Sequence, residues 1–118
     1  MRAAVDDFTV EEFRDDLERL SKKYRHLSKD LKTALKVLTK EPRNPSCSVR
    51  ISGLRKDTEL PIYKLKKFKS TDFHGKGSRS GFRLIYAYNE QENVIILVEV
   101  YHKKMKDNED RDRILRYF

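Results

Sequence analysis

The chain has 118 residues, of which 39% are charged and 37% are hydrophobic, and its formal net charge is +8. No apolar run is long enough to span a bilayer, so we expect one soluble domain, residues 1–118, with one modest core. The 27 Lys and Arg residues outnumber the 19 Asp and Glu residues, and the acids are concentrated near the two ends and in one turn, so the middle of the chain is strongly basic. This distribution favours a polyanionic partner, nucleic acid before an anionic membrane; a solvated basic surface without a partner is the alternative.

The sequence lacks the motifs of a secreted protein and of a metal-binding protein. The opening residues MRAAVDDFTVEEF contain neither the apolar segment nor the small-residue cleavage site of a signal peptide. Cys47 is the only cysteine, so no internal disulfide is possible, and both features favour a cytoplasmic protein. His26, His74 and His102 lack the spacing of zinc ligands, so we expect no metal and no cofactor.

The first predicted element is a helix that begins within FTVEEF. Thr9 is predicted to cap this helix, with Glu12 completing a capping box. Phe8 is predicted to pack against Phe13 as a hydrophobic staple.

An apolar stripe of helical period follows. Its members are Phe13, Leu17, Leu20, Tyr24, Leu27, Leu31, Ala34 and Leu38. Ser28 is a candidate N-cap within the stripe, which favours two helices, at about 9–23 and 28–40, folded as a hairpin, over one long helix. Pro42 and Pro45 end the helical part. The stripe is interpreted as a core face rather than as a coiled coil.

After an ambiguous segment, residues 46–59, the apolar period changes to two and predicts strands. In LPIYKLKKF, one face carries Ile62, Lys64 and Lys66, and the other carries Tyr63, Leu65 and Lys67. In GFRLIYAY, Phe82, Leu84, Tyr86 and Tyr88 oppose Arg83, Ile85 and Ala87. The sequence therefore separates an aromatic face from a cationic face, and Tyr86 and Tyr88 are expected in the core.

Two more elements complete the chain. The segment VIILVEVY, residues 94–101, is apolar on both faces, so we expect a central strand, joined to the preceding one by the turn NEQEN. The segment DNEDRDRILRYF predicts a short C-terminal helix capped by Asn108.

From about Leu17 to Lys106, the order and spacing of these elements resemble the RelE/ParE superfamily of bacterial toxins. The most specific feature is the Lys-x-Lys strand, with Lys64 and Lys66, followed beyond a Gly-rich turn by SGFRLIY, residues 80–86. The resemblance implies an α+β fold: an N-terminal helical hairpin packed on a small, mainly antiparallel sheet of three to four strands, with a short C-terminal helix. It also implies an open, basic face opposite the hairpin. Residues 1–8 match the first strand of the superfamily poorly.

RelE-type members cleave messenger RNA at the ribosome without a metal, by attack of a ribose 2′-OH on the adjacent phosphate. The resemblance assigns Lys66 as the base, if neighbouring positive charges favour its neutral form, and Lys64 and Arg83 as phosphate ligands. The acid comes from the segment after the last strand, where His102 is the better acid on chemical grounds and Lys104 is its substitute. Further RNA-binding candidates are Lys67, Lys69, Lys76, Arg79 and Lys103.

The implied partners are a cognate antitoxin, messenger RNA and the ribosome, and no membrane. A gyrase-inhibiting toxin of the same superfamily and a non-catalytic domain that binds RNA or ribosomes are the alternatives.

Phe68 and Phe73, which are flanked by lysines, are candidates for stacking on bases, with ordinary loop packing as the alternative. GKGSRSG is interpreted as a flexible basic turn, because no helix follows it at the spacing of a phosphate-binding loop. In some members the C-terminal helix carries a Tyr near the position of Asp110; here its only tyrosine is Tyr117.

Overall fold

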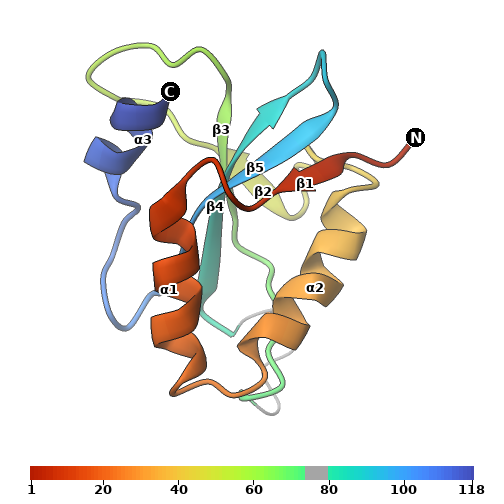
Figure 1. Cartoon of the computed structure of the whole chain (residues 1–118), viewed down its shortest axis with the longest axis vertical. Helices are drawn as coiled ribbons and strands as arrows, with labels where there is room; N and C mark the ends of the chain where they lie inside the picture. Colours follow the sequence, from red (N-terminus) through yellow and green to blue (C-terminus); the bar gives the residue numbers. More distant parts are fainter. Residues whose placement is uncertain (74–79) are drawn as a thin grey trace.

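The computed structural model describes residues 1–73 and 80–118 and shows one mixed sheet with helices on both faces (Figure 1). Its elements in chain order are β1 (Ala4–Asp6), α1 (Glu11–Ser21), α2 (Leu27–Leu38), β2 (Ser48–Arg50), β3 (Ile62–Leu65), β4 (Phe82–Asn89), β5 (Val94–His102) and α3 (Arg111–Tyr117). The strand order is β1-β5-β4-β3-β2, with β1 parallel to β5 and the other pairs antiparallel.

The predicted α+β class, the helical hairpin and the C-terminal helix are confirmed. The sheet has five strands in the described residues rather than three or four, because β1 and β2 also join it. Each of these strands has three residues, too few to show a period of two in the sequence. No helix in the described part of the chain is long and apolar enough to cross a membrane.

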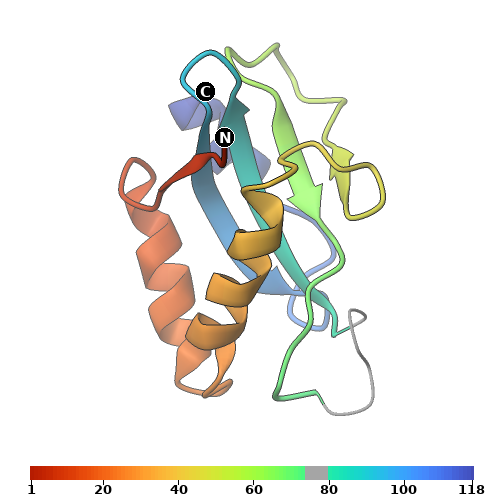
Figure 2. The ribbon, with the colours of Figure 1, turned by 90° about the vertical axis from the view of Figure 1, so that its right-hand side faces the viewer.

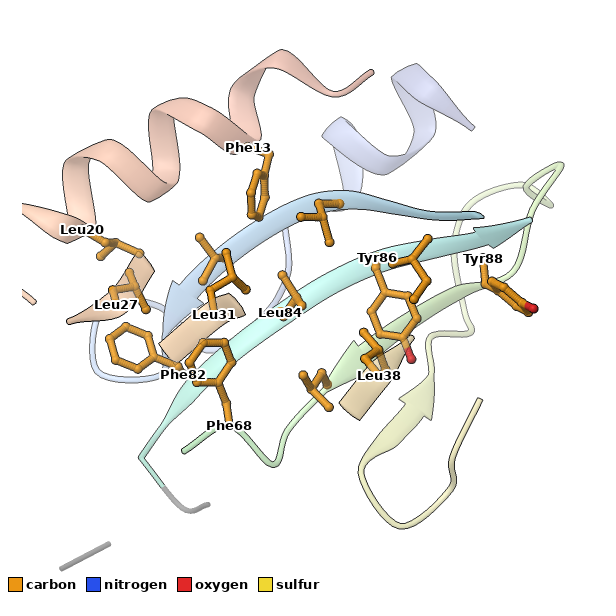
Figure 3. Close-up of a cluster of buried hydrophobic side chains, with 14 of the residues drawn as sticks. Phe13, Leu20, Leu27, Leu31, Leu38, Phe68, Phe82, Leu84, Tyr86 and Tyr88 are labelled. Atoms are coloured by element: carbon orange, nitrogen blue, oxygen red, sulfur yellow. The ribbon is translucent and has the colours of Figure 1, made fainter. Parts of the chain in front are cut away.

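The hairpin α1–α2 covers one face of the sheet and encloses the main core (Figures 2 and 3). The predicted stripe supplies the helical side of this core, with Phe13, Leu20, Leu27, Leu31 and Leu38 all buried. The sheet side comes from alternate residues of the strands, among them Leu65, Phe82, Leu84, Tyr86, Tyr88, Ile95, Leu97 and Val100. The predicted core positions of Tyr86 and Tyr88 are confirmed.

A second, smaller core lies on the opposite face, under α3 (Figure 2). It contains Ile62, Ile85, Ala87, Val98 and Ile114, with partly buried side chains from residues 51–60 packed around it. A bulge in the β4–β5 ladder separates the pairs Ile85–Glu99 and Tyr86–Leu97. Ile85 and Ala87 lie on the same face of β4 as Arg83 by simple alternation, so the basic face of the sheet is also partly apolar.

The predicted capping of the first helix is wrong. Val10 is the N-cap of α1 and makes no side-chain capping bond. Thr9 instead donates its hydroxyl to Asp6, at 2.6 Å, and the same carboxylate accepts the backbone N–H groups of Phe8 and Thr9. Phe8 is 64% exposed, so it forms no staple on the buried Phe13. The Asp6 turn therefore replaces the capping box as the link from β1 into α1.

The other two predicted caps are each displaced by about one turn or less. α2 begins after His26, not after Ser28, without a side-chain cap in the described residues. α3 is capped by Asp110, whose carboxylate accepts the N–H of Arg113 at 3.0 Å, and not by Asn108. In both cases the helix position is right and the capping residue is wrong.

Candidate nucleic-acid interface

The antiparallel ladders gather basic residues at one end of the sheet. β3 ends beside the start of β4, and β4 starts beside the end of β5. Lys66 directly follows β3, Arg83 lies near the start of β4, and Lys103 and Lys104 directly follow β5. We refer to these four residues as the basic end of the sheet.

Lys66 and Arg83 are linked through the backbone. Arg83 Nη1 donates to the carbonyl oxygens of Lys66, at 3.4 Å, and Phe82, at 3.2 Å. Lys66 is exposed, and its N–H donates to the carbonyl of Cys47 at 3.0 Å, which fixes the chain just beyond β3. The guanidinium is thus oriented by neutral acceptors and keeps its full charge for an anion.

Lys64 has a different environment from the other predicted cations. Its Nζ lies 2.7 Å from Glu109 Oε1, and the two side chains are only 13% and 2% exposed. Burial alone would lower the pKa of Lys64, but the contact with Glu109 raises it, so the ammonium stays charged. Lys64 is therefore neutralised by a carboxylate in this conformation rather than open to a phosphate.

His102 is not placed as an acid that meets substrate, which corrects its predicted role. It is fully buried, stacks on Phe73 with ring centroids 4.9 Å apart, and packs edge-on against Phe82. Nδ1 accepts the N–H of Lys104 at 3.1 Å, so Nε2 carries the proton and donates to the carbonyl of Ser80 at 2.9 Å. Burial is the main cause that lowers the pKa of His102, and the imidazole is a neutral part of the core.

Lys103 and Lys104 are exposed beside this buried histidine. The N–H of Lys103 donates to the carbonyl of Gly81 at 2.9 Å, which holds the start of the segment against the β4 end. Lys104 Nζ lies 5.9 Å from the centre of the Phe73 ring, within the range of a cation–π contact. Of the two predicted acids, Lys104 is the one at the surface.

The remaining predicted residues fall in three groups. Lys67 and Lys69 are exposed, but they line a groove on the α2 side of β3 rather than the basic end. Phe68 is fully buried among core side chains, so its predicted stacking role is wrong, and Phe73 is half-buried against His102. Lys76 and Arg79 lie outside the described residues, as does most of the predicted Gly-rich turn.

Three residues near Lys64 were not predicted from the sequence: Tyr101, Glu109 and Arg111. Tyr101 pairs with Arg83 in the β4–β5 ladder, so strand alternation could have placed it on the basic face. Glu109 reaches Lys64, and Arg111 reaches Glu109, only because the segment after β5 returns across the sheet, and no sequence period predicts that return. No group of three or more His, Cys, Asp or Glu side chains in residues 1–73 and 80–118 could hold a metal ion.

Comparison with known proteins places this geometry in a recognised fold. No family model matches the sequence, and no curated protein matches it. Solved structures with a similar fold include the E. coli toxin RelE, as a double arginine-to-alanine mutant in the free state, at a TM-score of 0.55 and 19% identity over 91% of this chain and 90% of that one. They also include an archaeal RelE–RelB complex from Pyrococcus horikoshii, at a TM-score of 0.57 and 16% identity over 90% of this chain and 100% of that one. The chain therefore has a RelE-like toxin fold, as the sequence resemblance implied.

Proposed function

We propose that this chain is the toxin of a toxin–antitoxin pair and that it inhibits translation by cleaving messenger RNA, without a metal, at the ribosome. The observation that carries the proposal is the basic end of the sheet in a RelE-like fold. Lys66, Arg83 and Lys104 come from three neighbouring strand ends, and none of them contacts a carboxylate within the described residues. Such a cluster suits a phosphodiester, whose transition state carries extra negative charge.

The proposed reaction is attack of the ribose 2′-OH on the adjacent phosphate. Lys66 acts as the base that takes the proton of the 2′-OH, and the new P–O bond forms as the P–O bond to the 5′-oxygen breaks. Arg83 donates to the non-bridging oxygens as their charge grows. Lys104 gives a proton to the departing 5′-oxygen, in the role first expected of His102. The products are a 2′,3′-cyclic phosphate and a 5′-hydroxyl.

Primer extension on messenger RNA after induction tests this proposal. Cuts within translated codons, lost in the Lys66→Ala and Arg83→Ala variants, are the expected result. Intact RNA together with double-strand DNA breaks would instead identify the gyrase-inhibiting alternative. The codon pattern of the cuts in purified translation reactions would show whether the ribosome is required.

A non-catalytic RNA-binding domain is the second candidate, and one observation favours it. The expected histidine acid is buried, and Lys64 is neutralised, so the site has fewer chemical groups than the sequence implies. Such a domain would bind RNA with a salt dependence of about 0.7 logarithmic units per phosphate contacted but leave the RNA intact at every pH.

The proposed antitoxin requires a docking surface, and the groove between α2 and β3 supplies one. Its cavity measures about 530 Å³. Its lining includes apolar side chains of Ala34, Val37 and Leu65, and lysines 67 and 69 lie beside them. We assign this groove to an amphipathic antitoxin segment with acidic residues on its polar side, because that chemistry complements both parts of the lining. Charge reversal at Lys67 and Lys69 should weaken a co-purified complex without changing the fold.

A further inference from the structure

The segment between β5 and α3 carries an acid into the basic face. Glu109 is 2% exposed as a side chain, and its two oxygens contact two different cations. Oε1 lies 2.7 Å from Lys64 Nζ, and Oε2 accepts from Arg111 Nε at 2.9 Å. Burial would raise the pKa of Glu109, but its contacts with these cations lower it, so the carboxylate stays ionised. A bound anion in this position would meet the same two donors.

A third polar group, the Tyr101 hydroxyl, lies near the Glu109 carboxylate. Tyr101 is 4% exposed, and its enclosed hydroxyl makes no hydrogen bond with any described residue. Burial raises the pKa of the hydroxyl overall, although the hydroxyl is near enough to Lys64 for that contact to lower the pKa. It is not well aligned for a hydrogen bond, and Glu109 Oε1 is likewise poorly aligned despite its short distance to Lys64. Both groups are therefore incompletely satisfied in a buried position.

We propose that Lys64, Tyr101 and Arg111 form an anion site that Glu109 fills in the free protein, and that a phosphate of bound RNA displaces Glu109 from it. This inference rests on RNA as the substrate. A phosphate has more acceptor oxygens than a carboxylate and a tetrahedral shape, so it can accept from the ammonium, the guanidinium and the hydroxyl together. The Glu109 carboxylate is thus an intramolecular competitor that lowers the affinity for RNA.

The attachments of this segment indicate how it would be released. Before α3, the N–H of Asp110 donates to Glu99 at 2.7 Å, and Lys106 pairs with the same carboxylate. Within α3, Arg113 makes a buried pair with Asp16 of α1, at 2.6 Å. Release of Glu109 therefore requires only the side chain to turn outward, while α3 stays attached to α1.

The test measures binding of a single-stranded RNA whose riboses are 2′-O-methylated, so that attack by a 2′-OH cannot occur. Glu109→Gln should bind this RNA about tenfold more tightly than the wild type, the effect of one added charged hydrogen bond. Its affinity should fall more steeply with salt, by about 0.7 logarithmic units, because in the wild type the displaced Glu109 carboxylate takes up a cation as the phosphate releases one. Glu92→Gln is the matched control, since it removes one exposed negative charge at the far end of the β4–β5 hairpin.

A double-mutant cycle shows whether the gain passes through Lys64. The gain from Glu109→Gln should disappear in a Lys64→Gln background and shrink in a Tyr101→Phe background. A gain that persists without Lys64 would overturn the assignment, because it would reflect net charge or a loosened segment. Equal affinities of Glu109→Gln and Glu92→Gln would overturn it as well.

The anion site can also be tested by NMR on the wild type, which requires no variant to fold. On addition of the methylated RNA, the amide signals of Glu109 and its neighbours should shift and the side-chain carboxyl carbon of Glu109 should change its chemical shift. Unchanged signals at saturation, or no RNA binding by any variant, would refute the anion site. Tight binding by Glu109→Gln without cleavage of unmodified RNA would support the site while refuting the nuclease, so the two proposals fail separately.

Discussion

The imidazole of His102 donates its Nε2 proton to the carbonyl of Ser80, which joins the end of β5 to the turn before β4. The other ring nitrogen accepts from the backbone of Lys104. The ring is thus a link between the two chain segments that carry Arg83 and Lys104, and its contribution to the site is positional.

Replacement of His102 should therefore destabilise the protein and change how stability depends on pH. His102→Leu should cost about 1–3 kcal/mol of unfolding free energy, since it leaves the Ser80 carbonyl and the Lys104 N–H without their imidazole partner. Burial lowers the folded pKa of His102 below the ordinary value of 6.5, so between these two values the unfolded chain binds more protons. The wild type should lose stability as pH falls through 6.5 toward the folded pKa, and the variant should lose less. Urea unfolding at pH 7.5 and 5.5 measures both effects. An equal change in unfolding free energy between these two pH values in the wild type and the variant would contradict the buried neutral ring.

Gly81 is predicted to tolerate no side chain. Its φ is +95°, and an added Cβ would lie 2.7 Å from His102 Nε2. Gly53 is the matched control, because its φ is +73° but the nearest atom to an added Cβ is 3.7 Å away. Gly53→Ala should cost about 1 kcal/mol through backbone strain alone, and Gly81→Ala should cost about 3 kcal/mol or more. Thermal unfolding would reveal the difference, and equal costs would contradict the close approach to His102.

Lys66 and Arg83 should affect the rate and not the stability. Each change to Ala is expected to lower RNA cleavage about a hundredfold or more, because each removes a group used in the transition state. Exposed charges without an ion pair contribute little to folding, so the unfolding free energy should change by less than about 0.5 kcal/mol. Lys36→Ala, an exposed lysine on α2, serves as the control. Full cleavage activity in a folded Lys66→Ala, Arg83→Ala double variant would leave the basic end as a binding surface only.

The pH dependence of cleavage distinguishes a lysine acid from a histidine acid. A histidine acid has an ordinary pKa of about 6.5 and would lose its proton above neutral pH, so the rate would fall there; if Lys104 is the acid, no such fall is expected between about pH 7 and 9. A rate that falls above about pH 7 would return the role to a histidine. Lys104→Ala should lower the rate at every pH, whereas Lys103→Ala should mainly weaken binding.

Glu12 should make the attachment of α3 sensitive to acid. The hydrogen bond from the Tyr117 hydroxyl is the main cause that lowers the pKa of Glu12 from 4.5 to about 2, and Arg116 adds to it. The folded pKa is below the unfolded one, so this contribution is complete above pH 4.5 and is lost as pH falls toward about 2. Glu12→Gln should flatten the acid limb of the stability curve, and Glu11→Gln, its neighbour, should not. Identical acid limbs in Glu12→Gln and the wild type would contradict this role.

Local periodicity was sufficient for the long elements. The helical stripe and the alternation from Phe82 to Tyr88 each assign residues to a face without any knowledge of the partner strand, and the observed core follows them. The burial of His102 could also have been predicted from the sequence. If the strand is extended by one residue beyond Tyr101, alternation places His102 on the same face as Val100. The predicted strand ended one residue too early.

The rest depends on contacts between distant residues. From the sequence alone, Lys64 is a typical exposed strand cation. In the structure it pairs with Glu109, which lies in a segment whose own sequence predicts only the start of a helix. Thr9 has the sequence of a cap, but Asp6 accepts its hydroxyl and its N–H instead. In both cases the local sequence is compatible with two arrangements of the side chain, and contacts with residues elsewhere in the chain determine which one forms.

The parallel pairing of β1 with β5 has a consequence for synthesis. Residues 4–6 find their partners only at residues 94–96, and β5 also completes the basic end of the sheet. A chain emerging from the ribosome therefore has neither its complete sheet nor its assembled basic end until β5 has been made, because these contacts join residues distant in sequence. We therefore expect a chain synthesised only as far as β4 to lack both the complete sheet and the basic end, and so to be inactive under the function proposed above.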